Sequence, residues 1–171
     1  ARLVEQLLTL ARLESGGQPG SMARCDLREI VRAEIAEHAP RALEKGLELA
    51  LEDGPPVWMN GDAGLLAILA RNLVDNAVRY TPDGGTIEAG VWRDGQDVRL
   101  EVRNSGPPLP SDALARLGER FYRPAGAEEP GSGLGLSIVG RIAELHGGRV
   151  RYSGGPDGSG FRAMVEFSKA E

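Results

Sequence analysis

The stretch LARNLVDNAVRYTP, residues 69–82, places two asparagines inside an otherwise apolar helical pattern. Asp62 can cap this helix. Asn72, Asn76 and Arg79 fall within roughly 60° of one another on a helical wheel. Beside them runs an apolar stripe of Leu66, Leu69, Leu73, Ala77 and Tyr80. The chain must therefore fold so that a core covers one face of this helix while the amides at its border find polar partners.

These amides have two explanations that the stretch alone does not separate. They can form hydrogen bonds with neighbouring loops, as half-buried amides commonly do. They can also belong to a metal and phosphate site, because an amide oxygen is a hard, neutral ligand for a magnesium ion that already carries phosphate oxygens. In that case Arg79 can meet the phosphate charge.

A second motif, GSGLGLSIVGRIAELHGG, places Gly131, Gly133 and Gly135 before a helix expected at 133–146. Glycines at a helix start expose backbone amides at the positive end of the helix dipole, where phosphate is favoured. No strand directly precedes the motif, and no Gly-Lys-Ser/Thr follows, so it fits neither a dinucleotide fingerprint nor a Walker loop. What remains is a glycine-hinged lid beside a helix start.

Helical and alternating patterns follow one another along the whole chain. Helices are expected at 1–15, 27–46, 62–80 and 133–146, and strands at 22–27, 47–52, 57–61, 86–92, 98–104, 148–155 and 160–168. Pro40 is expected to break or kink its helix, and 105–132 is expected to be irregular. The order predicts an α+β fold, a two-layer α/β sandwich whose mixed, mostly antiparallel sheet is covered on one face by three helices.

The composition of the chain argues against several classes of protein. The net charge of -5 argues against sequence-independent binding of nucleic acid, which needs a basic face. A single cysteine, Cys25, cannot form an internal disulfide and suits a reducing compartment. No run of the chain is apolar enough for a membrane span. The chain enters its opening helix without an N-cap, so we expect it to be a fragment.

A third motif, EVRNSGPPLP, runs from a strand into Asn104, Ser105 and Gly106. Together with the other motifs it makes the sequence resemble the catalytic, ATP-binding domain of two-component sensor histidine kinases, which have the Bergerat fold. RNLVDNAVRYTP resembles the N box, NSGPP the first glycine box, ERFYR the F box and GSGLGL the second glycine box. The resemblance implies a catalytic domain at 22–171, a linker at 16–21 and the C-terminal part of the dimerisation and phosphoacceptor helix at 1–15.

The resemblance also implies roles for individual residues, with ATP and Mg²⁺ as ligands. Asn76 is expected to bind Mg²⁺ with Asn72 beside it, and Asn72 and Arg79 are the expected catalytic residues. Asn104 is expected to meet the adenine amino group. The residues expected to contact the nucleotide are Asn76, Tyr80, Asn104, Gly106, Gly131, Gly133, Leu134, Gly135 and Leu136.

The sequence departs from the family pattern at three positions. Asn104 stands where the family has aspartate, and a neutral amide oxygen accepts the adenine hydrogen bond less strongly than a carboxylate. Pro108 stands where the family has glycine, and proline fixes φ and removes an N–H. Gly118 replaces the first phenylalanine of the F box. We therefore expect weaker nucleotide binding than is usual in the family.

The resemblance implies a reaction partner outside this chain. The nucleophile would be a histidine on the phosphoacceptor helices of the same protein, which forms a homodimer and passes the phosphate to a response regulator. The chain would be the cytoplasmic domain of a bacterial protein anchored in the inner membrane, without membrane or nucleic-acid contacts of its own. His38 and His146 fit capping or packing better than phosphate acceptance.

Two alternatives remain open. The first is a Bergerat-fold ATPase of the gyrase or chaperone type, but the glutamate that such enzymes place near Asn72 to activate water is absent. The second is a degenerate regulatory module with weak or no kinase activity, which the altered first glycine box supports. Phosphorylation of a histidine-bearing helix supplied in trans separates this module from a kinase.

Overall fold

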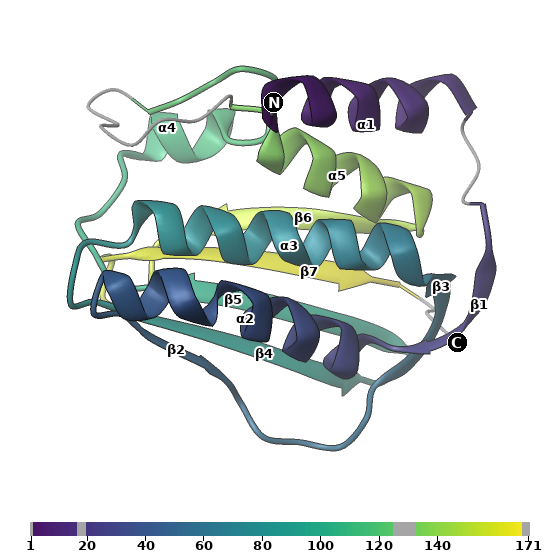
Figure 1. Ribbon diagram of the computed structural model, residues 1–171, viewed down its shortest axis with the longest axis horizontal. Coiled ribbons are helices and arrows are strands. Elements are labelled where there is room, and N and C mark those ends of the chain that lie inside the picture. The colour runs from purple at the N-terminus through teal and green to yellow at the C-terminus, as the bar shows by residue number, and fades with distance from the viewer. Residues whose placement is uncertain (1, 17–19, 125–132, 169–171) are drawn as a thin grey trace.

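A five-stranded sheet with helices on one face organises the residues that the computed structural model describes, which are 2–16, 20–124 and 133–168 (Figure 1). The strand order is β2 (Glu48–Leu51), β4 (Thr86–Asp94), β5 (Asp97–Asn104), β7 (Phe161–Phe167) and β6 (Gly148–Ser153). Only β2 and β4 are parallel neighbours in this sheet. The covering helices are α2 (Leu27–Glu44), α3 (Ala63–Tyr80) and α5 (Gly135–Leu145). The predicted two-layer α+β sandwich is confirmed.

The helix-facing side of the sheet is built from alternating apolar residues. Val98, Leu100 and Val102 of β5 are buried and lie opposite Phe167, Val165 and Ala163 of β7, which are also buried. Side chains at every second position point to the same face of a strand, so this register joins the two strands into one apolar surface. The predicted β4–β5 hairpin and its turn are confirmed as well.

The start of α3 is fixed by its cap and by a small second sheet. The Asp62 carboxylate accepts a hydrogen bond of 3.1 Å from the Leu65 N–H, as the capping pattern predicted. β1 (Met22–Asp26) pairs with β3 (Trp58–Asp62) directly before this helix. His146 Nε2 accepts the Asp62 N–H at 3.0 Å while Nδ1 lies 2.8 Å from the Ile142 carbonyl at the C-terminal cap of α5, so of the two expected roles, capping or packing, these contacts fit capping.

The opening helix, α1 (Arg2–Gly16), packs along α5 (Figure 1). Leu10 and Leu13 are buried in the same core as the sheet and α3. Other apolar side chains of α1 remain exposed, namely Leu3, Val4, Leu7 and Leu8. No helix in the described part of the chain is long and apolar enough to cross a membrane.

A buried arginine holds the connection between β2 and β3. Arg28 is 4% exposed and donates hydrogen bonds to the carbonyl oxygens of Glu52, Pro55 and Val91. Gly54 leaves room for it, because a side chain at that position would collide with the guanidinium group. The arginine therefore ties the loop after β2 to the middle of β4.

Two expectations about irregular segments are corrected in part. Of the break or kink expected at Pro40, the break does not occur: the helix continues to Glu44, because Val31 and Ala42 on either side of the proline are both buried in the core. Packing on both sides offsets the hydrogen bond that proline cannot donate. The segment expected to be irregular contains a short helix, α4 (Ser111–Arg116), which begins directly after Pro110.

Candidate functional site

A cavity of about 620 Å³ opens between α3, the start of α5 and the end of β5. It brings together most of the residues that the sequence singled out: Asn72, Asn76, Arg79, Tyr80, Asn104, Gly106, Gly133, Gly135 and Leu136. Leu134 is fully buried in the core and is not among the residues that line the cavity. Gly131 lies outside the described residues. Tyr80 was expected both in the apolar stripe of α3 and among the residues that contact the nucleotide; it is 38% exposed and lines the cavity, so it does not belong to the buried stripe.

The two asparagines of α3 differ in what they bind. Asn72 is buried, and its amide nitrogen donates a 2.8 Å hydrogen bond to the Ile68 carbonyl one turn earlier. Its amide oxygen lies 3.1 Å from the place where a Cβ on Gly135 would be, so a larger residue at this position would require the Asn72 side chain to shift. Asn76 is half-buried, and its side chain has no hydrogen bond within the described ranges. The Asn76 amide is thus available to a ligand in the cavity.

Gly133 lies two residues before the start of α5. Its φ of +75° favours glycine, and an added Cβ would lie 2.6 Å from the Phe121 carbonyl carbon. The Phe121 N–H donates a 2.9 Å hydrogen bond to the Gly133 carbonyl. Phe121 is 58% exposed. Phe121 therefore contacts Gly133 through its backbone and not through its ring.

Asn104 stands at the end of β5, where the chain turns along the cavity. Its amide nitrogen donates a 3.0 Å hydrogen bond to the Ser105 carbonyl, which leaves the amide oxygen as the acceptor of this side chain. The Gly160 N–H donates to the Gly106 carbonyl at 2.7 Å. A side chain at Gly160 would collide with the Asn104 carbonyl, so this close contact of two loops requires glycine.

The lining of the cavity is cationic although the chain as a whole is acidic. Its described charged residues are four cations and two acids: Arg2, Lys45, Arg79, Arg123, Asp75 and Asp83. Lys45 is placed by the C-terminal end of α3, where its ammonium group donates to the carbonyls of Val78 at 2.8 Å and Arg79 at 3.1 Å. A cavity with this charge favours a polyanion.

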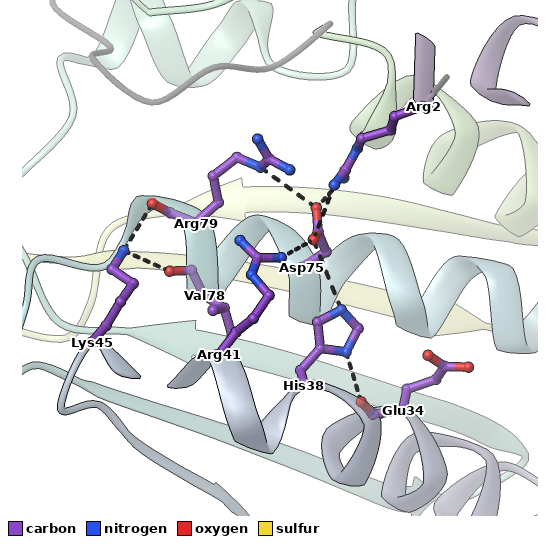
Figure 2. Close-up of polar contacts among 8 residues, drawn as sticks. All are labelled: Arg2, Glu34, His38, Arg41, Lys45, Asp75, Val78 and Arg79. Carbon is purple, nitrogen blue, oxygen red and sulfur yellow. Dashed lines mark hydrogen bonds and ion pairs between the residues drawn. The ribbon is translucent and has the colours of Figure 1, made fainter. Parts of the chain in front are cut away.

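Asp75 links three helices beside the cavity (Figure 2). Its carboxylate pairs with Arg2 of α1, with Arg41 of α2 at 2.8 Å and with Arg79 of α3, whose Nε lies 3.7 Å away. His38 Nε2 is 3.8 Å from the same carboxylate, and His38 Nδ1 is 2.7 Å from the Glu34 carbonyl. Burial raises the pKa of Asp75, but the hydrogen bonds and charges of the arginines outweigh it and hold this pKa below its ordinary value.

This cluster around Asp75 was not predicted from the sequence. The spacing of Asp75 and Arg79, four residues apart on one helix, was the signal that could have been used. Nothing in the sequence pattern connects Arg2 or Arg41 to Asp75, because these arginines come from other helices and meet it only in the folded chain.

A metal ion here would need ligands from a bound molecule. The described residues contain no group of three or more histidine, cysteine, aspartate or glutamate side chains that could hold a metal ion. Mg²⁺ usually takes few protein ligands, keeps several waters and binds substrate phosphates. One amide oxygen beside a cationic cavity fits Mg²⁺ that arrives on a phosphate chain, and it does not fit a metal held by protein alone.

The amino-acid sequence is similar to that of known proteins. Residues 61–171 match the family model described as histidine kinase-, DNA gyrase B-, and HSP90-like ATPase. The sensor protein QseC of Escherichia coli strain K12 is 41% identical over 97% of this chain. The match covers 36% of QseC, so the chain spans about a third of the length of this relative.

The fold is also similar to that of solved protein structures. ShkA, solved at full length with AMPPNP, is 31% identical with a TM-score of 0.83 over 99% of this chain and 35% of ShkA. The cytoplasmic segment of QseC is 32% identical with a TM-score of 0.65, over 97% of this chain and 90% of that segment. The histidine kinase ThkA, solved with the response regulator TrrA, shares the fold at 22% identity and a TM-score of 0.79, over 99% of this chain and 48% of ThkA.

Proposed function

Since the chain belongs to the histidine kinase-, gyrase B- and HSP90-like ATPase family, as the catalytic domain of a two-component sensor histidine kinase, we propose that it transfers the γ-phosphate of ATP to a histidine. The acceptor histidine lies on a dimerisation domain outside this chain. One observation carries the proposal: a single cationic cavity gathers the amide-bearing helix, the end of β5 and the glycine-started helix.

In this proposal the residues on each side of the cavity bind a different part of the nucleotide. Asn104 accepts a hydrogen bond from the adenine amino group, and the backbone around Gly133 and Gly135 gives the phosphate chain room and N–H donors. Asn76 supplies a protein ligand to Mg²⁺, which when bound would neutralise part of the triphosphate charge. Asn72 and Arg79 act beside it at the phosphates. Phosphoryl transfer needs mostly positioning and charge neutralisation, and these residues provide both.

The partners follow from the same proposal. We assign residues 1–15, which include most of α1 (Arg2–Gly16), to the end of the dimerisation and phosphoacceptor helix, residues 16–21 to the linker and 22–171 to the catalytic domain. The complete kinase forms a homodimer anchored in the inner membrane, with this part in the cytoplasm. It passes its phosphate to a response regulator. The solved cytoplasmic segment of QseC and the complex of ThkA with TrrA support this arrangement.

Transfer of labelled phosphate in trans tests the proposed function. The chain is incubated with Mg²⁺, γ-labelled ATP and a separately produced phosphoacceptor hairpin of a QseC-type kinase. We expect label on the hairpin that is lost in acid and kept in base, as phosphohistidine requires. A hairpin with glutamine in place of the acceptor histidine is the matched control and should remain unlabelled. A chain that binds ATP but labels neither hairpin would be a regulatory module and would contradict the kinase proposal.

Asn104→Asp should strengthen ATP binding. A carboxylate accepts the adenine hydrogen bond with charge assistance, which we expect to lower the dissociation constant about fivefold, or about 1 kcal/mol. Titration calorimetry with AMPPNP and Mg²⁺ measures it. Asn60→Asp is the control, because Asn60 is exposed on β3, away from the cavity. The proposed role of Asn104 would be contradicted if the unsubstituted chain bound AMPPNP with a low-micromolar dissociation constant and Asn104→Asp bound it no more tightly.

A further inference from the structure

Asp75 collects more positive charge than one carboxylate can neutralise (Figure 2). Arg2, Arg41 and Arg79 all pair with it, so the cluster has an excess of two positive charges even when His38 is neutral. Like charges held this close at the edge of a protein core repel one another. An additional anion beside the cluster would relieve this repulsion.

The cluster borders the proposed nucleotide cavity. Arg2, Asp75 and Arg79 line it together with Asn76. Asp75 directly precedes Asn76 on α3, and the guanidinium group that Asp75 holds belongs to a residue of the same cavity lining as Asn76. Arg41 pairs with Asp75 but is not among the residues that line the cavity. Among the described residues that line the cavity, Arg2 is the cation that comes from α1.

The position of Arg2 is fixed by more than its ion pair. Leu10 and Leu13 anchor α1 in the core. One turn after Arg2, the amide nitrogen of Gln6 lies 3.9 Å from the place that a Cβ on Gly135 would occupy. Gln6 lines the cavity as well. The first turns of α1 thus run along the glycine-rich start of α5, where phosphate is expected.

We propose that Arg2 is a phosphate-contacting residue that α1 supplies to the nucleotide site, and that Asp75 is the positioning residue that holds its guanidinium group there. The inference rests on the proposed binding of ATP. The Arg2 side chain is 48% exposed and carries five N–H donors, so it can keep its pair with Asp75 and still donate to phosphate oxygens. The site thereby favours nucleotides with a phosphate chain over the bare nucleoside, and it is complete only while α1 is docked.

A comparison of ligands with and without phosphate tests the role of Arg2. The 171-residue chain and its Arg2→Gln variant are titrated with AMPPNP and Mg²⁺ by calorimetry and with adenosine by NMR. We expect Arg2→Gln to weaken AMPPNP binding about tenfold and to change adenosine binding by less than about twofold. Arg12→Gln is the matched control, because Arg12 is exposed on the same helix and does not line the cavity. It should match the unsubstituted chain for both ligands.

A double-mutant cycle tests the role of Asp75. If Asp75 positions Arg2, the AMPPNP loss caused by Arg2→Gln should shrink to less than about threefold in an Asp75→Asn background. A loss of about tenfold in both backgrounds would overturn the positioning role.

Three other results would overturn the role of Arg2 itself. The first is that Arg2→Gln binds AMPPNP as the unsubstituted chain does, and the second is that it binds AMPPNP more tightly. The third is that Arg2→Gln loses the same factor in affinity for adenosine as for AMPPNP, which is the result that a purely structural arginine would give. In each case the unsubstituted chain still binds AMPPNP and the proposed function stands. A chain that does not bind AMPPNP at all would overturn both.

Discussion

Asn76→Ala is expected to weaken the binding of AMPPNP with Mg²⁺ about 100-fold, because in the proposed site the metal loses the amide ligand assigned to it. The loss should depend on the metal. In EDTA, where the nucleotide carries no Mg²⁺, the variant and the unsubstituted chain should bind with similar, weak affinity. Calorimetry in the two buffers measures both values on the same protein. Because Asn76 is half-buried and its side chain has no hydrogen bond within the described ranges, the fold should not change.

Asn60→Ala is the matched control for this prediction. Asn60 is exposed on β3, and its replacement should leave nucleotide binding unchanged in both buffers. An equal loss for Asn76→Ala with and without Mg²⁺ would show that the residue acts through packing. Undiminished binding in Mg²⁺ would remove Asn76 from the metal site.

Arg28→Ala should lower the free energy of unfolding by about 3 kcal/mol, because three carbonyl oxygens lose a charged, buried donor. The loop between β2 and β3 then loses its attachment to β4. Urea unfolding followed by circular dichroism measures the change. The free energy of unfolding of Arg28→Lys should lie between that of Arg28→Ala and that of the unsubstituted chain. An ammonium group cannot reach all three acceptors with the geometry of a planar fork.

Arg32→Ala is the control for Arg28. Arg32 is exposed one turn along the same helix and pairs only with Glu29 in the part of the chain that the structure describes. A surface pair of this kind contributes little, so the loss should stay below about 0.5 kcal/mol. If Arg28→Ala cost no more than Arg32→Ala, water would satisfy the three carbonyls equally well and the arginine would not hold the loop.

The sequence predicted those parts of the fold that repeat over several turns or strand pairs. The stripe of α3 and its Asp62 cap could be located because a helix that packs on a sheet must be apolar at intervals of three and four residues. The hairpin of β4 and β5 could be located from alternation on both sides of a turn. By contrast, α4 spans only six residues, which is too short for a periodic pattern.

The site was predictable where its residues belong to motifs. Asn72, Asn76, Asn104, Gly133 and Gly135 do line one cavity, as the resemblance implied. The cluster of arginines around Asp75 and the buried Arg28 were not predictable, because their partners lie far away along the chain and on other elements. A sequence taken alone shows which residues can form ion pairs, but the fold decides which of them meet.

Backbone NMR of the 171-residue chain during titration with AMPPNP and Mg²⁺ tests the central claim most directly. If the triphosphate binds between α3 and the start of α5, the amide signals of Asn76 and Gly133 should shift and saturate together, while that of Asn60 on β3 stays in place. If a saturating concentration of the nucleotide left the signals of Asn76 and Gly133 unmoved, this cavity would not be the ATP site and the kinase proposal would fail.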